Sequence, residues 1–165
     1  MENMNIHFRQ VPEPDRDKFQ MWYKRIGGPE LFTHCIPSSF VSFERYQDLL
    51  WFIILDNDDE IGTIWFEKND TDKMGYDLGI YLNRVELFGK GIGKMVINAA
   101  IDSIIRKKGI REIHLNVRQN NVRAIRCYEG LGFETINEGE KETDSGTIKF
   151  KKMKLLLCSD KPASA

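Results

Sequence analysis

Few cysteines and the absence of a long apolar run limit what this chain can be. Cys35, Cys127 and Cys158 are odd in number and widely spaced, and they form no CxxC pair. This disfavours a disulfide framework or a zinc site and fits a reducing cytoplasm. No apolar segment approaches the roughly 20 residues that a transmembrane helix needs. The polar segment Met1–Asn5 lacks the basic and apolar regions of a signal peptide. We therefore expect a cytoplasmic protein without a membrane partner.

The chain also lacks an excess of charge of either sign. Its 24 Lys and Arg residues balance 25 Asp and Glu residues, for a formal net charge of -1. The whole molecule therefore has no electrostatic attraction for nucleic acid. A content of 41% hydrophobic and 30% charged residues is typical of a globular protein. The length of 165 residues predicts one domain, which we expect to span residues 1–158, with 159–165 as a frayed tail.

Hydrophobic periodicity predicts a chain in which strands and helices are mixed. The order predicts an α+β fold around a mixed sheet, rather than a doubly wound one. The expected strands are 6–10, 51–55, 61–66, 75–82, 112–117, 133–137 and 147–157, and the expected helices are one opening at 12–15 and ending near 26, a short one at 43–50, a long one at 91–108 and one at 121–131. The expected connections are an irregular stretch at 30–41, a turn at 56–60, a polar loop at 68–73 and an acidic link at 138–146.

A glycine-rich loop stands between the strand 75–82 and the long helix. Gly89, Gly91 and Gly93 leave a run of backbone N–H groups without Cβ atoms at the start of that helix. A helix N-terminus carries about half a positive charge and several unpaired donors, so a pyrophosphate fits it. Lys90 and Lys94 add neutralising charge. A turn that only lets the strand enter the helix explains the same glycines, and both interpretations stay open at this point.

Two familiar phosphate-binding motifs fail on spacing. A Walker A loop requires G-x-x-x-x-G-K-[S/T], but Phe88 and Met95 occupy its first glycine and its hydroxyl positions. The dinucleotide fingerprint requires G-x-G-x-x-G, but Lys94 occupies its third glycine position. Nucleotide hydrolysis and hydride transfer are therefore disfavoured.

A second segment combines three residues that suit a ligand. Asn121 can cap the helix 121–131 and offer an amide, Ala124 lets a ligand approach the backbone, and the phenol of Tyr128 can donate a proton. Each residue alone is better explained as a helix cap or a core side chain. Their joint occurrence after a strand, about thirty residues beyond the glycine loop, favours a shared site.

At these two segments the chain resembles the GNAT superfamily of acetyl-CoA-dependent N-acetyltransferases. The superfamily's first motif, [Q/R]-x-x-G-x-[G/A], matches at Gly91 and Gly93, whereas Phe88 replaces the usual Gln or Arg. The second motif, N-x-x-A-x-x-x-Y-x-x-x-G-F, matches at every position, namely Asn121, Ala124, Tyr128, Gly132 and Phe133.

Within the superfamily, the second segment is most similar to aminoglycoside 6′-N-acetyltransferases, followed by ribosomal-protein alanine acetyltransferases. This chain differs from those enzymes in the region that is expected to bind the amine substrate. Those enzymes carry an acidic residue where this chain has Gly79, and an acidic tract where it has Lys68–Met74. Asp77 lies two residues before Gly79, hence on the same face of the strand.

The resemblance implies a mostly antiparallel sheet of about seven strands with about four helices. The strands Gly75–Leu82 and Glu112–Val117 should be parallel neighbours, because one helix connects them, with a V-shaped opening between them. The resemblance implies acetyl-CoA as co-substrate and no metal. The residues expected to bind acetyl-CoA are Ile80, Tyr81, Leu82, Phe88, Gly89, Lys90, Gly91, Ile92, Gly93, Lys94, Asn116, Asn121, Ala124 and Tyr128.

The resemblance also implies direct transfer of the acetyl group to a primary amine of a small molecule or a peptide. Tyr128 is the expected acid toward the leaving thiolate, and Asp77 is the expected base. Phe32–Phe40 is expected to form a wall on the acceptor side, and a homodimer stays open. Two alternatives remain: a non-catalytic acetyl-CoA-binding regulatory module, and an interaction domain whose glycine loop is only a turn.

Overall fold

The structure is a computed structural model that describes residues 3–11, 16–32, 34–37, 49–68 and 75–158. Several expectations lie wholly or partly outside these described residues. They are most of the short helix at 43–50, the polar loop at 68–73 apart from Lys68, and the tail at 159–165.

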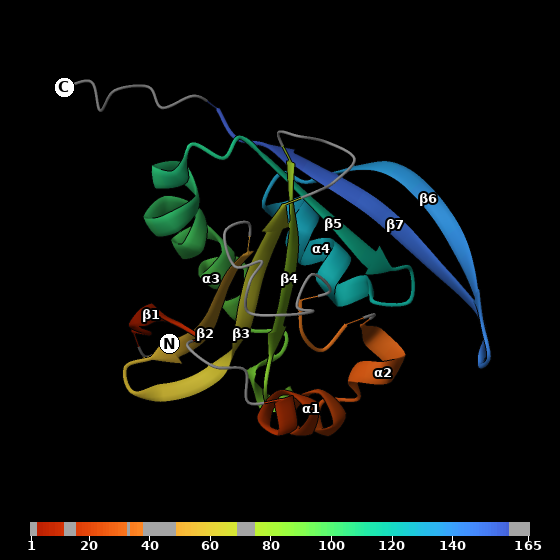
Figure 1. Ribbon diagram of the computed structural model, residues 1–165, viewed down its shortest axis with the longest axis horizontal. Coiled ribbons are helices and arrows are strands. Elements are labelled where there is room, and N and C mark those ends of the chain that lie inside the picture. Colours follow the sequence, from red (N-terminus) through yellow and green to blue (C-terminus); the bar gives the residue numbers. More distant parts are fainter. Residues whose placement is uncertain (1–2, 12–15, 33, 38–48, 69–74, 159–165) are drawn as a thin grey trace.

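The described strands form one seven-stranded mixed sheet (Figure 1). All neighbouring strands are antiparallel except β4 and β5. This confirms the expected α+β fold. In spatial order the strands are β1 (Ile6–Gln10), β2 (Leu49–Asp56), β3 (Asp59–Lys68), β4 (Gly75–Leu82), β5 (Glu112–Arg118), β7 (Gly146–Leu156) and β6 (Glu134–Thr143).

The parallel pair β4 and β5 creates the opening in the sheet. The two strands pair only at their beginnings, where Gly75–Asp77 lies opposite Glu112–His114. Beyond these residues β4 continues to Leu82 and β5 to Arg118 without further pairing to each other. The expected parallel arrangement is thus confirmed, and one edge of β4 is open from Leu78 onward.

Four α-helices accompany the sheet in the described residues. They are α1 (Arg16–Arg25), α2 (Gly28–Leu31), α3 (Ile92–Ala100) and α4 (Val122–Gly130). A 3₁₀ turn at Val85–Leu87 precedes α3. The helix continues beyond α3 through a π-helical turn at Ile101–Ile105 and a 3₁₀ turn at Arg106–Lys108. Gly109 (φ 72°) ends the whole helical segment, as expected. No described helix is long and apolar enough to cross a membrane.

The sheet separates two hydrophobic cores, because successive strand residues point to opposite faces. On one face, Ile64 and Phe66 of β3 pack with Val96 and Ile97 of α3. On the other face, the apolar stripe of α1 packs on aromatic side chains of the sheet. Phe19 and Trp22 of α1, together with Ile26 directly after it, meet Trp51, Trp65 and Tyr81. Helices therefore cover both faces near the opening between β4 and β5.

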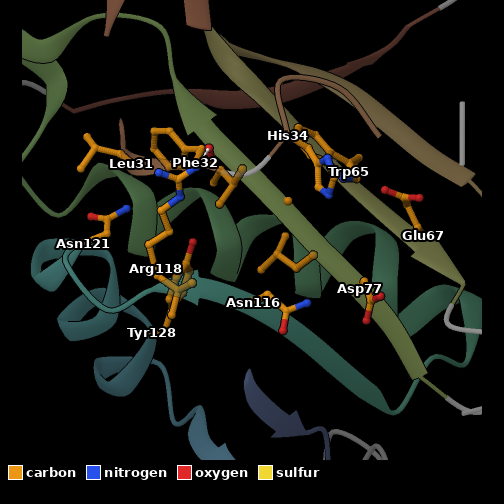
Figure 2. A pocket seen from close by; sticks show the side chains of 14 residues that line it. Leu31, Phe32, His34, Trp65, Glu67, Asp77, Asn116, Arg118, Asn121 and Tyr128 are labelled. Atoms are coloured by element: carbon orange, nitrogen blue, oxygen red, sulfur yellow. Dashed lines mark hydrogen bonds between the residues drawn. The ribbon is translucent and has the colours of Figure 1, made fainter. Parts of the chain in front are cut away.

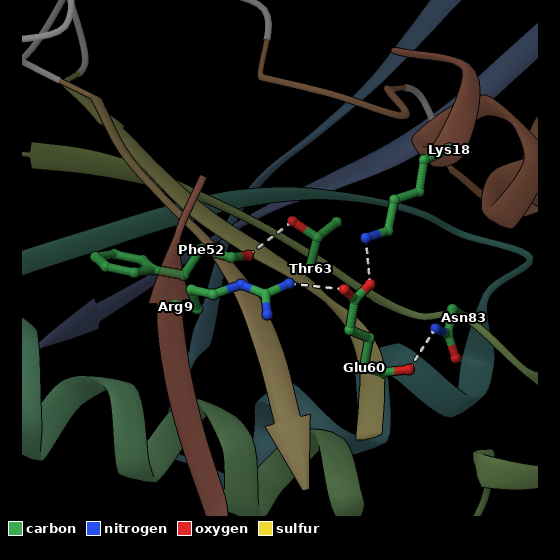
Figure 3. A network of polar contacts seen from close by, with 6 residues as sticks. All are labelled: Arg9, Lys18, Phe52, Glu60, Thr63 and Asn83. Carbon is green, nitrogen blue, oxygen red and sulfur yellow. Dashed lines mark hydrogen bonds and ion pairs between the residues drawn. The ribbon is translucent and has the colours of Figure 1, made fainter. Parts of the chain in front are cut away.

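A polar network ties the elements at the far end of β4 together (Figure 3). The Glu60 carboxylate accepts a hydrogen bond from Arg9 Nη2 at 2.6 Å and forms an ion pair with Lys18 of α1. Burial acts to raise the pKa of Glu60, but hydrogen bonds and charges from Lys18 and Arg9 outweigh it and lower that pKa. Asn83, just beyond β4, donates from Nδ2 to the Glu60 backbone oxygen at 2.8 Å. The chain is thus fixed where it leaves the sheet toward the glycine loop.

The structure corrects four sequence expectations. The link 138–146 is mostly strand, because β6 and β7 form one long hairpin in which Glu138 faces Lys151 and Glu140 faces Lys149. These cross-strand charge pairs suit the exposed strand β6, which has no apolar alternation. Leu49 and Leu50 begin β2 rather than end a helix. Part of the stretch expected to be irregular is the short helix α2. Only residues 57–58 of the expected turn at 56–60 lie between strands.

Candidate functional site

One cavity, here called the donor cavity, lies between the end of β4, the glycine loop and α4. Its volume is about 330 Å³. It brings together the two sequence segments that carry the motifs. The expected cofactor residues that line it are Ile80, Tyr81, Leu82, Phe88, Gly89, Gly91, Ile92, Gly93, Lys94, Asn121, Ala124 and Tyr128.

The backbone of the glycine loop is exposed to this cavity. Gly89 (φ 72°) and Gly91 (φ 77°) adopt left-handed conformations, and a Cβ atom added to either would meet no atom within 4 Å. Glycine is therefore required for the backbone conformation rather than for lack of space. Gly91 is the N-cap of α3, so the unpaired N–H groups at the start of this helix lie at the cavity.

The donor cavity is positively charged. Lys94, Arg123 and Arg126 line it, and none of the described residues lining it is Asp or Glu. On the opposite wall, Asn121 caps α4 by accepting a hydrogen bond at Oδ1 from the Ala124 N–H at 3.3 Å. The cavity therefore offers cations and backbone donors to an anionic ligand.

A second cavity, here called the acceptor cavity, lies where β4 and β5 separate. Its volume is about 220 Å³, and β3, β4, β5 and the segment that follows α2 line it. Figure 2 shows Glu67 and Asp77 at one end of this cavity and Asn121 and Tyr128 at the other. Phe32 and His34 line it as well, as expected for the segment Phe32–Phe40, of which 33 and 38–40 lie outside the described residues.

Two carboxylates give the far end of the acceptor cavity its charge. Glu67 of β3 and Asp77 of β4 are direct cross-strand partners, so their side chains lie on the same face of the sheet. Glu67 is only 8% exposed, and both residues make other interactions within the protein. Two neighbouring carboxylates facing a cavity favour a cationic ligand.

The indole of Trp65 explains why position 79 is a glycine. A Cβ atom built on Gly79 would lie 2.1 Å from Trp65 Cε2, which is closer than any real contact. The indole thus occupies the space into which a side chain at 79 would extend. The carboxylates of this cavity therefore come from the neighbouring positions 67 and 77.

Arg118 joins the end of β5 to the other wall of the acceptor cavity. Its Nη1 donates to the backbone oxygen of Glu30 at 3.0 Å, and its Nη2 donates to that of Phe32 at 3.1 Å. Glu30 lies near the end of α2, and Phe32 is the residue directly after this helix. Arg118 therefore fixes the segment that carries Phe32 against the sheet.

Tyr128 lies at the junction of the two cavities, because it lines both of them, as do Phe32, Ile80 and Asn121. Its side chain is buried and packs edge-on against Phe133 at 5.7 Å between ring centroids. Burial, with a smaller effect of the Cys127 thiol, raises the pKa of the Tyr128 phenol above its usual value. The phenol is therefore protonated at neutral pH and can donate a hydrogen bond or a proton.

Not every expected site residue lies at the donor cavity. Asn116 lines only the acceptor cavity, and Lys90 lines neither cavity. Tyr81 lines the donor cavity, while its phenol donates to the Cys35 backbone oxygen at 2.6 Å. Burial raises the pKa of the Cys127 thiol, although the charge of Lys94 opposes this shift, so the environment does not favour a nucleophilic thiolate.

Sequence reasoning missed four charged residues of the site: Glu67, Arg118, Arg123 and Arg126. Glu67 comes one residue after the strand expected at 61–66, and Arg118 comes one residue after the strand expected at 112–117. Side chains two residues apart in a strand lie on the same face. Counting two residues on from Trp65 and from Asn116 would therefore have identified Glu67 and Arg118. Among the described residues, no group of three or more His, Cys, Asp or Glu side chains could hold a metal ion.

Comparison with known proteins gives a family match that spans both cavities. Residues 14–133 match the model of the acetyltransferase (GNAT) family. A kanamycin resistance protein from Rhizobium radiobacter is 32% identical over 87 residues, which cover 53% of this chain and 77% of that protein. A probable spermine N(1)-acetyltransferase from Bacillus subtilis subsp. natto is 30% identical over 90 residues, which cover 52% of this chain and 51% of that protein.

The fold has solved counterparts. The crystal structure of the aminoglycoside acetyltransferase AAC(6′)-Ib in complex with coenzyme A superposes with a TM-score of 0.69 at 21% sequence identity. The superposition covers 92% of this chain and 95% of that chain. The sheet, its opening and the helices that cover it are therefore a shared architecture.

Proposed function

This chain belongs to the acetyltransferase (GNAT) family, and we propose that it transfers an acetyl group from acetyl-CoA to a primary amine of a small polycationic molecule. One observation carries this proposal: Tyr128 lines both a cationic cavity and a cavity with two carboxylates. An anionic donor and a cationic acceptor would thus meet at a phenol that can donate a proton.

The donor cavity fits the chemistry of acetyl-CoA. The backbone N–H groups at Gly89–Gly93 and the ammonium of Lys94 suit a pyrophosphate. The edge of β4 beyond Asp77, which β5 leaves unpaired, suits an extended amide chain such as the pantetheine arm. Ala124 leaves room beside this edge because its side chain is a single methyl group.

Tyr128 is the proposed acid. The thioester of acetyl-CoA supplies the acetyl group: a C–N bond forms to the amine and the C–S bond breaks. Tyr128 Oη then donates its proton to the departing sulfur, and the nitrogen releases its remaining extra proton to water as the amide forms. Because its pKa is raised, the Tyr128 phenol is protonated before transfer. After it has donated its proton, the phenolate takes a proton back from solvent.

The acceptor cavity supports an amine that carries more than one positive charge. One ammonium can bind at Glu67 while a second amine extends toward Tyr128. Linear polyamines and aminoglycosides meet this requirement, and both classes appear in the names of relatives of this chain. A peptide N-terminus carries one ammonium at the reacting end and lacks the second anchor.

Asp77 is the proposed base. An ammonium with a pKa near 10 is only about one part in a thousand neutral at pH 7, so the amine must lose a proton before it attacks. Because Asp77 lies at the end of the cavity away from Tyr128, the proton would reach it through water in the cavity rather than directly. Glu67, beside it, remains an anchor for the second charge.

The test is an acetyl-transfer assay that detects the free thiol of CoA. Spermine, spermidine, kanamycin and a peptide with a free N-terminus serve as acceptors, and binding of CoA is measured separately by calorimetry. Turnover with a polyamine or an aminoglycoside above that with the peptide supports the proposal. Binding of CoA with no turnover of any polycationic amine would indicate a non-catalytic module, and absence of CoA binding would overturn the donor site.

A further inference from the structure

The first motif position of the glycine loop has lost its usual polar side chain. Phe88 stands where the resembling family has Gln or Arg. Its ring is partly buried and packs against both hydrophobic cores, and it also lines the donor cavity. A phenyl ring cannot donate a hydrogen bond to a phosphate, so position 88 supplies no side-chain donor to the cavity.

A cation from another part of the chain lies over that ring. The guanidinium carbon of Arg123 is 4.0 Å from the centroid of the Phe88 ring. Arg123 is the second residue of α4, and it lines the donor cavity together with Phe88. A guanidinium that stacks by its face keeps the N–H donors on its edge available, and stacking restricts the rotation of a long side chain.

We propose that Arg123, held in place by Phe88, binds a phosphate group of CoA. This inference rests on the proposed function, because it assumes that the donor cavity takes CoA. Lys94 and Arg126 line the same cavity, and none of its described residues is a carboxylate, so a phosphate there meets no repelling negative charge. The planar guanidinium matches two phosphate oxygens, which an ammonium does not.

The experiment measures the Kd of CoA by calorimetry for the wild type and for Arg123→Ala. Loss of one charged hydrogen-bonding group should weaken binding about 10-fold. Arg111→Ala is the matched control, because Arg111 is exposed, lines neither cavity and carries the same charge. Its CoA Kd should stay within about twofold of the wild type, because removal of a remote exposed charge is largely screened.

Two further variants test the role of the ring. Phe88→Leu keeps Arg123 but removes the stacking, so the Kd should rise roughly 3-fold, as expected for one exposed cation–π contact. Phe88→Arg in the Arg123→Ala background returns a guanidinium to the same place and should recover most of the lost affinity. A purely structural role of Arg123 would leave the double variant as weak as Arg123→Ala.

The Kd of 3′-dephospho-CoA shows which phosphate group of CoA Arg123 binds, the pyrophosphate or the 3′-phosphate. If Arg123→Ala weakens CoA and 3′-dephospho-CoA equally, the bound group is the pyrophosphate; if it weakens only CoA, the group is the 3′-phosphate. Either result supports the inference. Unchanged Kd values for both ligands, with a wild type that binds CoA, would overturn it and leave the proposed function intact. A wild type that does not bind CoA would instead overturn the proposed function.

Discussion

The two cavities that meet at Tyr128 are built in different ways. The donor cavity comes mainly from two short segments, residues 88–94 and 121–128, and from backbone groups and cations. The acceptor cavity collects side chains from three strands and from the segment after α2, and its far end carries Glu67 and Asp77. The groups proposed to bind the donor are therefore close together in sequence and mostly backbone. The side chains proposed to select the acceptor are brought together only by the tertiary fold.

The largest expected effect concerns the residue that both cavities share. Tyr128→Phe should lower kcat by roughly 10²–10⁴-fold, because the ring stays and only the proton donor is lost. The Kd of CoA should change little, since packing against Phe133 is kept. Steady-state kinetics and calorimetry on the same preparation measure both quantities. If the variant keeps more than about a third of the wild-type kcat, Tyr128 is not the general acid.

The donor cavity can be disrupted without touching the acceptor cavity. Gly91→Asp places a carboxylate beside the start of α3, where an anionic ligand is expected, and like-charge contacts of this kind cost several kcal/mol, or roughly 100-fold in Kd for CoA. Gly109→Asp is the matched control, because Gly109 has the same left-handed backbone (φ 72°) and equal open space, but lies outside both cavities. Equal loss of CoA affinity in both variants would mean that backbone strain, and not the site, is responsible.

The acceptor cavity can be tested with a matched pair of substitutions at its charged end. Glu67→Gln should raise the KM for spermine about 10-fold with little change in kcat, because it removes a charged anchor from the acceptor. Asp77→Asn should instead lower kcat with little change in the KM for spermine, as expected for loss of a base. CoA binding should be unaffected in both. If the two variants behave alike, Asp77 is a second anchor and water is the base.

The smallest expected effect is on stability. Gly79→Ala forces a methyl group against the Trp65 indole and should destabilise the fold by about 1–3 kcal/mol, which is typical of overpacking. The same substitution in a Trp65→Ala background should cost much less, because the clash is gone. Urea unfolding of the four proteins gives the coupling between the two positions. A cost that does not depend on Trp65 would show that the indole does not determine the residue at 79.

The same contrast between local and distant determinants explains what could be predicted from the sequence. The parallel pair β4 and β5, the long helix ended by Gly109 and the cap at Asn121 follow from periodicity and turn chemistry, and the structure confirms them. Both strands of the β6 and β7 hairpin were expected, but the continuation of β6 over residues 138–143 was missed, because this segment is charged or polar and has no apolar alternation.

The residues of the site show the same contrast between local motifs and contacts that are distant in sequence. Tyr128 and most residues expected to bind the cofactor line the donor cavity, because their motif fixes them along the chain. The Trp65 ring over Gly79, the bonds from Arg118 to the end of α2 and the stacking of Arg123 on Phe88 join residues that are 14 or more positions apart in sequence. Neither periodicity nor a local motif reports such contacts.

The central claim is that an anionic donor and a polycationic acceptor meet at Tyr128, each from its own cavity. A crystal structure of the protein with CoA and spermine tests it most directly. The account predicts the CoA sulfur within hydrogen-bond distance of Tyr128 Oη, the pyrophosphate at Gly89–Gly93, and one ammonium of spermine at Glu67. A CoA sulfur remote from Tyr128, or spermine bound outside the cavity between β4 and β5, would contradict it.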